Sequence, residues 1–201
     1  MTRTGAWILL FILAVVGGVW WLASRSGPVT EVTAEPASAK SASAAPARLP
    51  PSPYAPSRAS GLIIPVNGVW QAGLTDTWGD ARGDGTREHH AIDIMAPKGT
   101  AVVAAAAGTV EKIFESQNGG HTVYVRRTDP AWVDYYAHLD AYAPNLKEGQ
   151  KLGQGDLIGA VGSTGDASEE APHLHYEIKR MGPGDKWWQG TEVNPYPLLA
   201  R

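Results

Sequence analysis

Metal-binding side chains are grouped in two short stretches, one holding His89 and Asp93 and the other His173 and His175. The members of the first pair are four positions apart, and those of the second pair are two apart. Even spacings place side chains on one face of a β-strand, so each pair is predicted to converge on a single point. Zinc accepts imidazole nitrogens and a carboxylate oxygen, and a catalytic zinc site keeps three protein ligands and an open position for water. The two stretches therefore indicate a zinc site.

A third stretch, Tyr136-Ala137-His138-Leu139, adds one more histidine. A single histidine in an apolar strand is more often a hydrogen-bonded core residue than a ligand, so each stretch alone is weak evidence. Their joint occurrence favours the metal site. The chain has no cysteine, so its metal site contains no thiolate. It also lacks the His-Glu-x-x-His, Gly-x-Ser-x-Gly and Gly-x-x-x-x-Gly-Lys motifs of other hydrolases and of nucleotide-binding proteins.

The order His-x-x-x-Asp, Tyr-Ala-His-Leu and His-Leu-His resembles the lysostaphin-type (LytM-like) zinc peptidases, which cut peptidoglycan cross-links. The resemblance runs from about Leu62 to the C-terminus and includes the glycine-bounded segments 99–110 and 149–162. Carried over residue by residue, it implies two groups of site residues. The implied zinc ligands are His89, Asp93 and His175, and the implied catalytic pair is His138 and His173.

The resemblance implies a zinc-dependent endopeptidase with water as the nucleophile. Zinc would polarise the scissile carbonyl and lower the pKa of water toward about 7. His138 and His173 would then accept a proton and stabilise the developing oxyanion, and the sequence leaves open which residue does which. The alternative is a catalytically silent cell-wall-binding or hydrolase-regulating module on the same fold. Retention of all five site residues favours the enzyme.

Several neighbours of these motifs carry weaker predictions. Ala91 stands where the family usually has glycine, and Glu169 and Glu170 put acidic charge beside the expected groove. Arg82 and Arg87 either meet a carboxylate of the stem peptide, which guanidinium groups pair with well, or are ordinary surface charge. The substrate preference therefore stays open.

Strand alternation adds two predictions around the histidines. Tyr136 and His138 are two positions apart, so Tyr136 is expected to share a face with His138 and to line the site. Glu177 has the same phase as His175 and is a candidate for orienting its imidazole.

Composition favours one folded unit that does not bind nucleic acid. The chain has 201 residues and a formal net charge of −3, which suits a single domain with extra segments. It gives no electrostatic reason for binding nucleic acid. The implied partners are peptidoglycan stem peptides and a membrane, and nothing in the sequence indicates an oligomeric state.

Residues 1–23 are predicted to form a transmembrane anchor. The uncharged run from Ala6 to Ala23 would span roughly 27 Å as a helix, close to the thickness of a bilayer core. The alternative is a cleaved signal peptide, but its apolar region would be only about 7–15 residues long. Residues 24–60, rich in Ala, Pro and Ser, are predicted to be a disordered linker. The expected location is the cell membrane, single-pass, with the catalytic domain on the periplasmic or extracytoplasmic side.

Residues 61–201 are predicted to form the peptidase domain, an all-β antiparallel sheet or sandwich. Short β-type runs alternate there with Gly, Asn, Asp and Pro turn signals. The segment 149–165 also resembles half of a lipoyl-domain hammerhead and is expected to form a β-hairpin. The strand candidates are 101–103, 110–114, 121–125, 133–137, 157–161 and 174–178.

Overall fold

The computed structural model describes residues 61–83 and 85–200. The predicted anchor (1–23) and linker (24–60) lie outside this range, and their boundaries stay predictions. Among the described residues, no helix has the length and apolar character needed to cross a bilayer.

The regular secondary structure of the described residues is almost entirely β-strand, with only two short helical segments, η1 (Gln71–Gly73) and α2 (Tyr196–Leu199). A small sheet pairs β1 with β2, and the remaining strands form one nine-stranded sheet. The strands are β1 (Ala81–Arg82), β2 (Arg87–Glu88), β3 (Ile92–Met95), β4 (Ala101–Val103), β5 (Gly108–Ser116), β6 (Gly120–Arg127), β7 (Trp132–Tyr142), β8 (Lys151–Leu152), β9 (Leu157–Val161), β10 (His173–Arg180) and β11 (Thr191–Val193).

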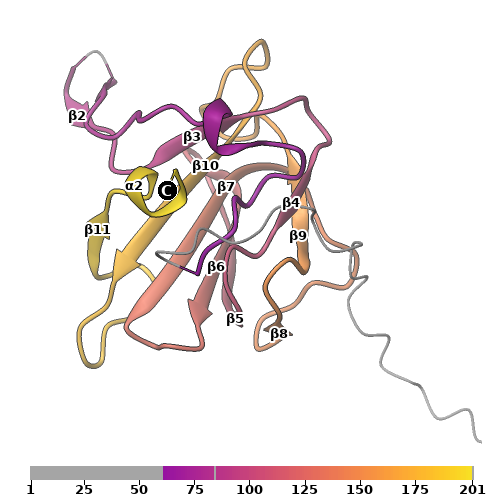
Figure 1. The fold of residues 1–201 in the computed structure, drawn as a ribbon, viewed down its shortest axis with the longest axis vertical. Coiled ribbons are helices and arrows are strands. Elements are labelled where there is room, and N and C mark those ends of the chain that lie inside the picture. Colours follow the sequence, from indigo (N-terminus) through magenta and orange to yellow (C-terminus); the bar gives the residue numbers. More distant parts are fainter. Residues whose placement is uncertain (1–60, 84, 201) are drawn as a thin grey trace, which may run out of the picture. The chain divides into compact units, whose positions relative to one another are not determined.

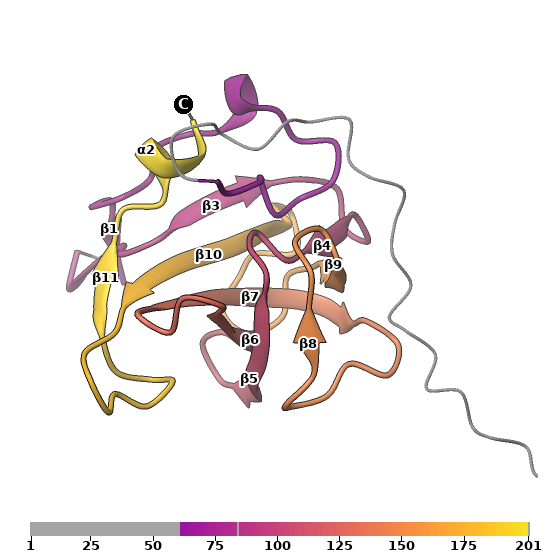
Figure 2. The same ribbon diagram turned by 60° about the horizontal axis from the view of Figure 1, so that its bottom comes forward.

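The main sheet is antiparallel in all its described pairings and branches at two long strands. Along its main path the order is β11-β10-β7-β6-β5-β8, with β3 also paired to β10 and β9 paired to both β4 and β7. Figure 1 and Figure 2 show β10 and β7 running side by side through the middle of the sheet. The predicted antiparallel all-β class is confirmed, and the six predicted strands coincide with or overlap β4, β5, β6, β7, β9 and β10.

The expected hairpin in 149–165 is wrong. Its two strands do not pair with each other, because β8 pairs with β5 whereas β9 pairs with β4 and β7. A tight turn separates them, in which the amide of Gly153 donates to Asp156 Oδ2 at 2.7 Å. The glycines and apolar residues of this segment therefore join distant parts of the sheet.

Side chains along β10 alternate between the apolar core on one face of the sheet and a polar pocket on the other. Leu174, Tyr176 and Ile178 are fully buried in the main apolar core. The residues between them, His173, His175 and Glu177, all line a pocket on the opposite face of the sheet. A strand of this pattern holds polar side chains rigidly, because the alternate residues are packed on one side.

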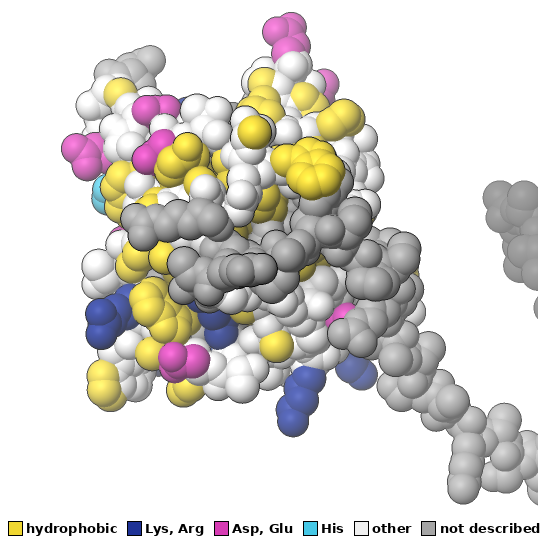
Figure 3. Space-filling model, in the orientation of Figure 1, with side chains coloured by type: hydrophobic (Ala, Val, Ile, Leu, Met, Phe, Trp, Pro, Cys, Tyr) yellow, Lys and Arg dark blue, Asp and Glu magenta, His cyan; other side chains and the backbone are white. Residues whose placement is uncertain are grey.

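Charge is unevenly distributed over the face drawn in Figure 3. Lysine and arginine side chains lie in its lower half, and most of the acidic side chains lie in its upper half. Histidine shows there only as a small patch at one edge.

Candidate metal centre

Asp93 and His175 face each other across two neighbouring strands. Asp93 lies on β3, His175 lies on β10, and the antiparallel register pairs the two residues directly. Directly opposed residues have Cβ atoms only about 4.5–5.5 Å apart, so their side chains meet when they point to the same face. The sheet itself thus brings a carboxylate and an imidazole together.

His89 is not positioned by strand alternation as predicted. It precedes β3 and lies in the connection after β2, so the expectation that His89 and Asp93 share one strand face is wrong. Backbone hydrogen bonds hold it instead: its amide donates to Asp80 O at 2.9 Å, and its carbonyl accepts from the amide of Gly79 at 2.8 Å. The side chain is buried beside Asp93 nonetheless.

The three side chains converge closely enough to share one ion. Ligand atoms of His89, Asp93 and His175 all lie within 4.8 Å of one another. Asp93 Oδ1 is 3.1 Å from His89 Nε2 and 3.3 Å from His175 Nδ1. It is also buried without a hydrogen bond to any described residue. A buried carboxylate oxygen that faces two imidazole nitrogens in this way fits a cation with nitrogen and oxygen ligands, as zinc prefers.

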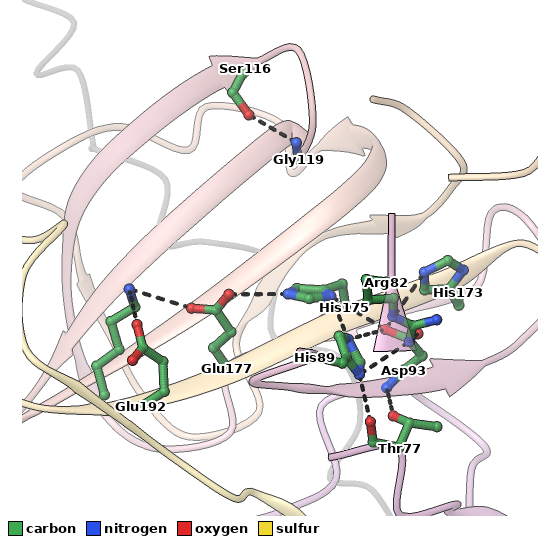
Figure 4. Close-up of polar contacts among 11 residues, drawn as sticks. Thr77, Arg82, His89, Asp93, Ser116, Gly119, His173, His175, Glu177 and Glu192 are labelled. Carbon is green, nitrogen blue, oxygen red and sulfur yellow. Dashed lines mark hydrogen bonds and ion pairs between the residues drawn. The ribbon is translucent and has the colours of Figure 1, made fainter. Parts of the chain in front are cut away.

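Outer contacts orient each of these side chains (Figure 4). His89 Nδ1 lies 2.8 Å from the carbonyl oxygen of Thr77, so a proton there leaves Nε2 facing the cluster. On the other ring, His175 Nε2 lies 3.1 Å from Glu177 Oε1, which leaves Nδ1 facing Asp93. The predicted contact between Glu177 and His175 is confirmed. Contacts of this kind fix the tautomer of a metal-binding histidine.

Arg82 makes a contact that neither interpretation of the sequence named. Its guanidinium Nη2 donates to Asp93 Oδ2 and lies 3.1 Å from His89 Nδ1. The guanidinium therefore occupies the outer oxygen of the carboxylate and leaves Oδ1 facing the histidines. Arg87, by contrast, is exposed, with Nη2 4.0 Å from Asp166.

The electrostatics of the cluster favour positive charge at its centre. Burial raises the pKa of Asp93, but the rings of His175 and His89 outweigh it and hold that pKa well below its usual range. Burial lowers the pKa of His175, but Asp93 and Glu177 on either side outweigh it and raise the pKa to about 9. The cluster thus keeps Asp93 ionised, and the two carboxylates beside His175 favour a positive charge there.

His138 reaches the same pocket from an irregular part of β7. Its backbone has a φ of 59°, in the left-handed region, and its amide donates to Gly119 O at 2.8 Å. Its ring lies 5.0 Å from that of His173 and 5.6 Å from that of His175, centre to centre. Burial lowers the pKa of His138, so the ring is neutral at neutral pH.

His138 and His173 present the same ring nitrogen to the pocket. His138 Nδ1 is 2.8 Å from Thr164 O, and His173 Nδ1 is 2.8 Å from Ala171 O. A carbonyl oxygen only accepts, so each Nδ1 carries the proton and each Nε2 keeps its lone pair. Both rings are therefore set up to accept a proton through Nε2.

The expectation that Tyr136 lines the site is wrong. Tyr136 is fully buried in the core, and its hydroxyl accepts from the amide of Ala105 at 2.9 Å. The register between β6 and β7 shifts between Tyr136 and Leu139, and His138 adopts its positive φ there, so alternation fails across the bulge. Tyr135 lines the pocket in its place.

One pocket among the described residues contains all five predicted site residues, His89, Asp93, His138, His173 and His175. Sequence reasoning missed the groups that orient them: Arg82 as a partner of Asp93, and the carbonyls of Thr77, Thr164 and Ala171. Backbone carbonyls carry no residue-type signal. Only the folded structure shows which carbonyl oxygens lie beside these rings.

Comparison with known proteins gives a family. Residues 87–195 match peptidase family M23, and the chain belongs to this family. It is 36% identical over 129 residues to an L-Ala–D-Glu endopeptidase of Bacillus subtilis, covering 61% of this chain and 38% of the relative. It is also 31% identical over 129 residues to the murein hydrolase activator NlpD of Escherichia coli, covering 64% of this chain and 29% of that relative.

A solved structure supports the fold. The catalytic domain of the antimicrobial peptidase lysostaphin from Staphylococcus simulans superimposes with a TM-score of 0.54 at 27% identity, covering 64% of this chain and 92% of that domain. The chain spans well under half the length of the two curated relatives, whereas it matches nearly all of this catalytic domain. The predicted resemblance to lysostaphin-type peptidases is confirmed.

Proposed function

We propose that this chain is a zinc-dependent endopeptidase that hydrolyses peptide cross-links of peptidoglycan. The observation that carries the proposal is the convergence of His89, Asp93 and His175 within 4.8 Å, with Asp93 Oδ1 buried and lacking a hydrogen bond among the described residues. Membership of peptidase family M23 supports the peptidase chemistry. The endopeptidase name of the Bacillus relative supports the substrate class.

Each residue of the site has a separate task in this proposal. His89 through Nε2, His175 through Nδ1 and Asp93 through Oδ1 would hold the zinc ion. Zinc bound there supplies a Lewis acid for the scissile carbonyl and makes a water molecule more acidic. Arg82 keeps the outer oxygen of Asp93 occupied, so that the carboxylate presents one atom.

His138 and His173 handle protons on either side of the reacting bond. Each has an Nε2 lone pair directed into the pocket, because its Nδ1 donates to a backbone carbonyl. One takes a proton from the attacking water, and the other, once protonated, donates to the developing negative oxygen. A lowered pKa suits His138 to the accepting role, since the ring is neutral before the reaction.

Incubation of the full chain with purified cross-linked peptidoglycan tests the proposal. Mass analysis of the products is expected to show dimeric muropeptides converted into monomers while glycan strand length stays unchanged. A zinc chelator is expected to stop the reaction. Shortened glycan strands with intact dimers would instead identify a glycan hydrolase and refute the endopeptidase.

The position of the cut belongs to the same experiment. A direct D-alanyl cross-link is our proposed target in preference to a glycine bridge, and this choice rests on the proposed membrane-anchored architecture. The Bacillus relative is named for cleavage between L-Ala and D-Glu, inside the stem peptide. Fragment masses separate the three possibilities, because each cut leaves a different terminal residue.

The similarity to NlpD, named a murein hydrolase activator, supports a second candidate: a catalytically silent module that regulates other hydrolases. This chain retains all five predicted site residues in one pocket, which favours the enzyme. Failure to release muropeptides, combined with stimulation of a separate hydrolase, would establish the second candidate.

We also propose where the chain lies in the cell. The uncharged run of residues 6–23 would hold the chain in the cell membrane, with the peptidase domain on the periplasmic or extracytoplasmic side, where peptidoglycan lies. N-terminal sequencing of the mature protein tests this. A chain that begins near Ser24 would show that the run is a cleaved signal.

A further inference from the structure

A series of aromatic rings leads away from the pocket across the same face of the sheet. Tyr135 lines the pocket, and its ring centre lies 6.0 Å from that of His175. Tyr124 on β6 is the cross-strand partner of Tyr135, and their ring centres are 4.4 Å apart. Trp187 follows at 4.8 Å from Tyr124. The rings therefore form a continuous packed series from the histidine cluster across β7 and β6, with Tyr124 and Tyr135 buried and Trp187 partly exposed.

The path ends in exposed aromatic side chains. The ring centre of Trp187 lies 5.0 Å from that of Trp188 and 5.5 Å from that of Phe114 on β5. Trp188 is 51% exposed and Phe114 is 42% exposed. We call Phe114, Trp187 and Trp188 the aromatic surface. Exposed rings grouped in this way typically mark a binding site.

The loop that carries the two tryptophans is held in place by its own hydrogen bonds. The amide of Gly182 donates to Asp185 Oδ2 at 2.7 Å, and the amide of Lys186 donates to Gln189 Oε1 at 2.8 Å. Arg126 on β6 ties the loop to the sheet by donating to Asp185 O at 3.1 Å. A surface ordered before binding loses less entropy when a ligand arrives.

The charged groups beside the aromatic surface are largely paired with one another. Arg126 makes two hydrogen bonds to Glu111, of 2.7 and 3.0 Å, and Lys112 Nζ lies 2.7 Å from Glu148. Lys186 places its Nζ 5.1 Å from the Trp188 ring centre. The surface thus offers aromatic faces and one ammonium donor, Lys186, while Arg126 and Lys112 are already paired with carboxylates.

We infer that the aromatic surface binds the N-acetylated sugar rings of the polymer whose peptide enters the pocket. A pyranose ring has C–H groups on its faces, which are attracted to the negative face of an indole, and hydroxyls at its edges, which accept hydrogen bonds from an ammonium. Uncharged sugar suits this surface better than a stem peptide with its charged groups. The inference rests on the proposed peptidoglycan substrate.

The distance along the path agrees with this arrangement. Four ring-to-ring steps of 4.4–6.0 Å lead from His175 to Trp188, so the straight distance between them is at most about 20 Å. An extended stem peptide of four residues covers up to about 14 Å of that distance. The attached sugar chain continues from the end of the stem toward the tryptophans.

Titration of the full chain in detergent with a soluble oligomer of N-acetylglucosamine tests the sugar site without requiring catalysis. Saturable binding is expected, weakened about fivefold in Trp188→Ala, because a stacked ring contributes on the order of 1 kcal/mol. Trp188→Tyr keeps an aromatic face and is expected to restore most of the affinity. Trp70→Ala removes another exposed tryptophan, outside the aromatic surface, and serves as the control.

Absence of oligomer binding, or equal affinity in wild type and Trp188→Ala, overturns the inference. So does a stem peptide without sugar that binds the wild type and loses its affinity in Trp188→Ala, because the surface would then bind peptide. If the oligomer binds through Trp188 but no muropeptide is ever cut, the sugar site stands and the proposed peptidase function fails.

A second readout uses cleavage itself. The ratio of kcat/KM for a cross-linked muropeptide with its sugars to kcat/KM for the same cross-link without them measures the contribution of the sugar. The ratio is expected to exceed 1 in the wild type, to fall toward 1 in Trp188→Ala, and to stay at the wild-type value in Trp70→Ala. A wild-type ratio of 1 contradicts the inference.

Discussion

The two halves of the histidine pocket are built in different ways. His173 and His175 stand on β10, a regular strand whose alternate residues fill the core. His89 lies before β3 and His138 lies at a bulge in β7, where strand alternation does not apply. A regular strand positions side chains through its own pleat, whereas the irregular half depends on contacts made by neighbouring loops. Substitutions should therefore act locally on β10 and through the loops on the other half.

Removal of a proposed ligand is expected to have the largest effect. Asp93→Ala and His175→Ala should lower the zinc content from about one ion per chain to nearly none and abolish cleavage, because two of three ligands are too few to hold the ion. Atomic absorption on the purified full chain measures this. His121→Ala, which removes a histidine outside the pocket, is the control and should retain zinc.

His138→Ala should separate catalysis from metal binding. We expect zinc content to stay at the wild-type value while cleavage of cross-linked muropeptides slows by about 10²- to 10⁴-fold, the usual contribution of a general acid or base. Rate and zinc content are measured on the same preparation. Loss of zinc in His138→Ala together with its retention in His89→Ala would show that the two residues have exchanged roles.

Glu177→Gln probes the regular half one step further out. The carboxylate lies 3.1 Å from His175 Nε2, and the glutamine amide would keep an acceptor there but remove the negative charge. Substitution of such a partner typically weakens metal binding by about 10- to 100-fold. Competition with a chelator gives the zinc affinity. Glu192→Gln is the matched control, because Glu192 reaches Glu177 only through Lys179. Equal affinities in the two variants would contradict an orienting role for Glu177.

Gly120→Ala tests the loops of the irregular half. Gly120 has a φ of 60°, and a Cβ there would lie 2.4 Å from the carbonyl carbon of Thr164, whose oxygen accepts from His138. Gly99 also has a positive φ, 87°, but a Cβ there meets nothing within 4 Å. Both alanine variants are strained, and the close contact should cost Gly120→Ala about 1–3 kcal/mol more.

Chemical denaturation of both glycine variants measures their free energies of unfolding. Cleavage should also fall in Gly120→Ala, since the carbonyl that orients His138 must move. Equal losses of stability in the two variants would show that the Thr164 segment yields without resistance, and that it does not hold His138.

More of the regular half of the pocket than of the irregular half could be predicted from the sequence. The β-type runs between turn signals located six of the described strands. Alternation placed Glu177 beside His175, because the pleat has a period of two residues. The same rule failed for Tyr136, since the bulge at His138 shifts the phase, and for His89, which lies outside a strand. Even spacing grouped His89 with Asp93 and His173 with His175, and the family resemblance joined these two pairs with His138 in one site.

The remaining features depend on contacts between distant segments. The pairing of β8 with β5 and of β9 with β7 joins residues that no local pattern links, so the expected hairpin was wrong. The contact between Arg82 on β1 and Asp93 on β3 joins two separate strands, so no local pattern indicated it. Such pairings depend on how the whole sheet folds, and no local sequence pattern specifies them.

The double pairing of β10 sets the order in which the pocket comes apart. This strand is hydrogen-bonded to β7 along one edge and to β3 and β11 along the other. Its amide hydrogens should exchange with deuterium only when the whole sheet opens. The short strands β1 and β2 leave the segment before His89 to exchange through local opening. Deuterium uptake would therefore show His89 leaving first, while His175 and Asp93 keep their places.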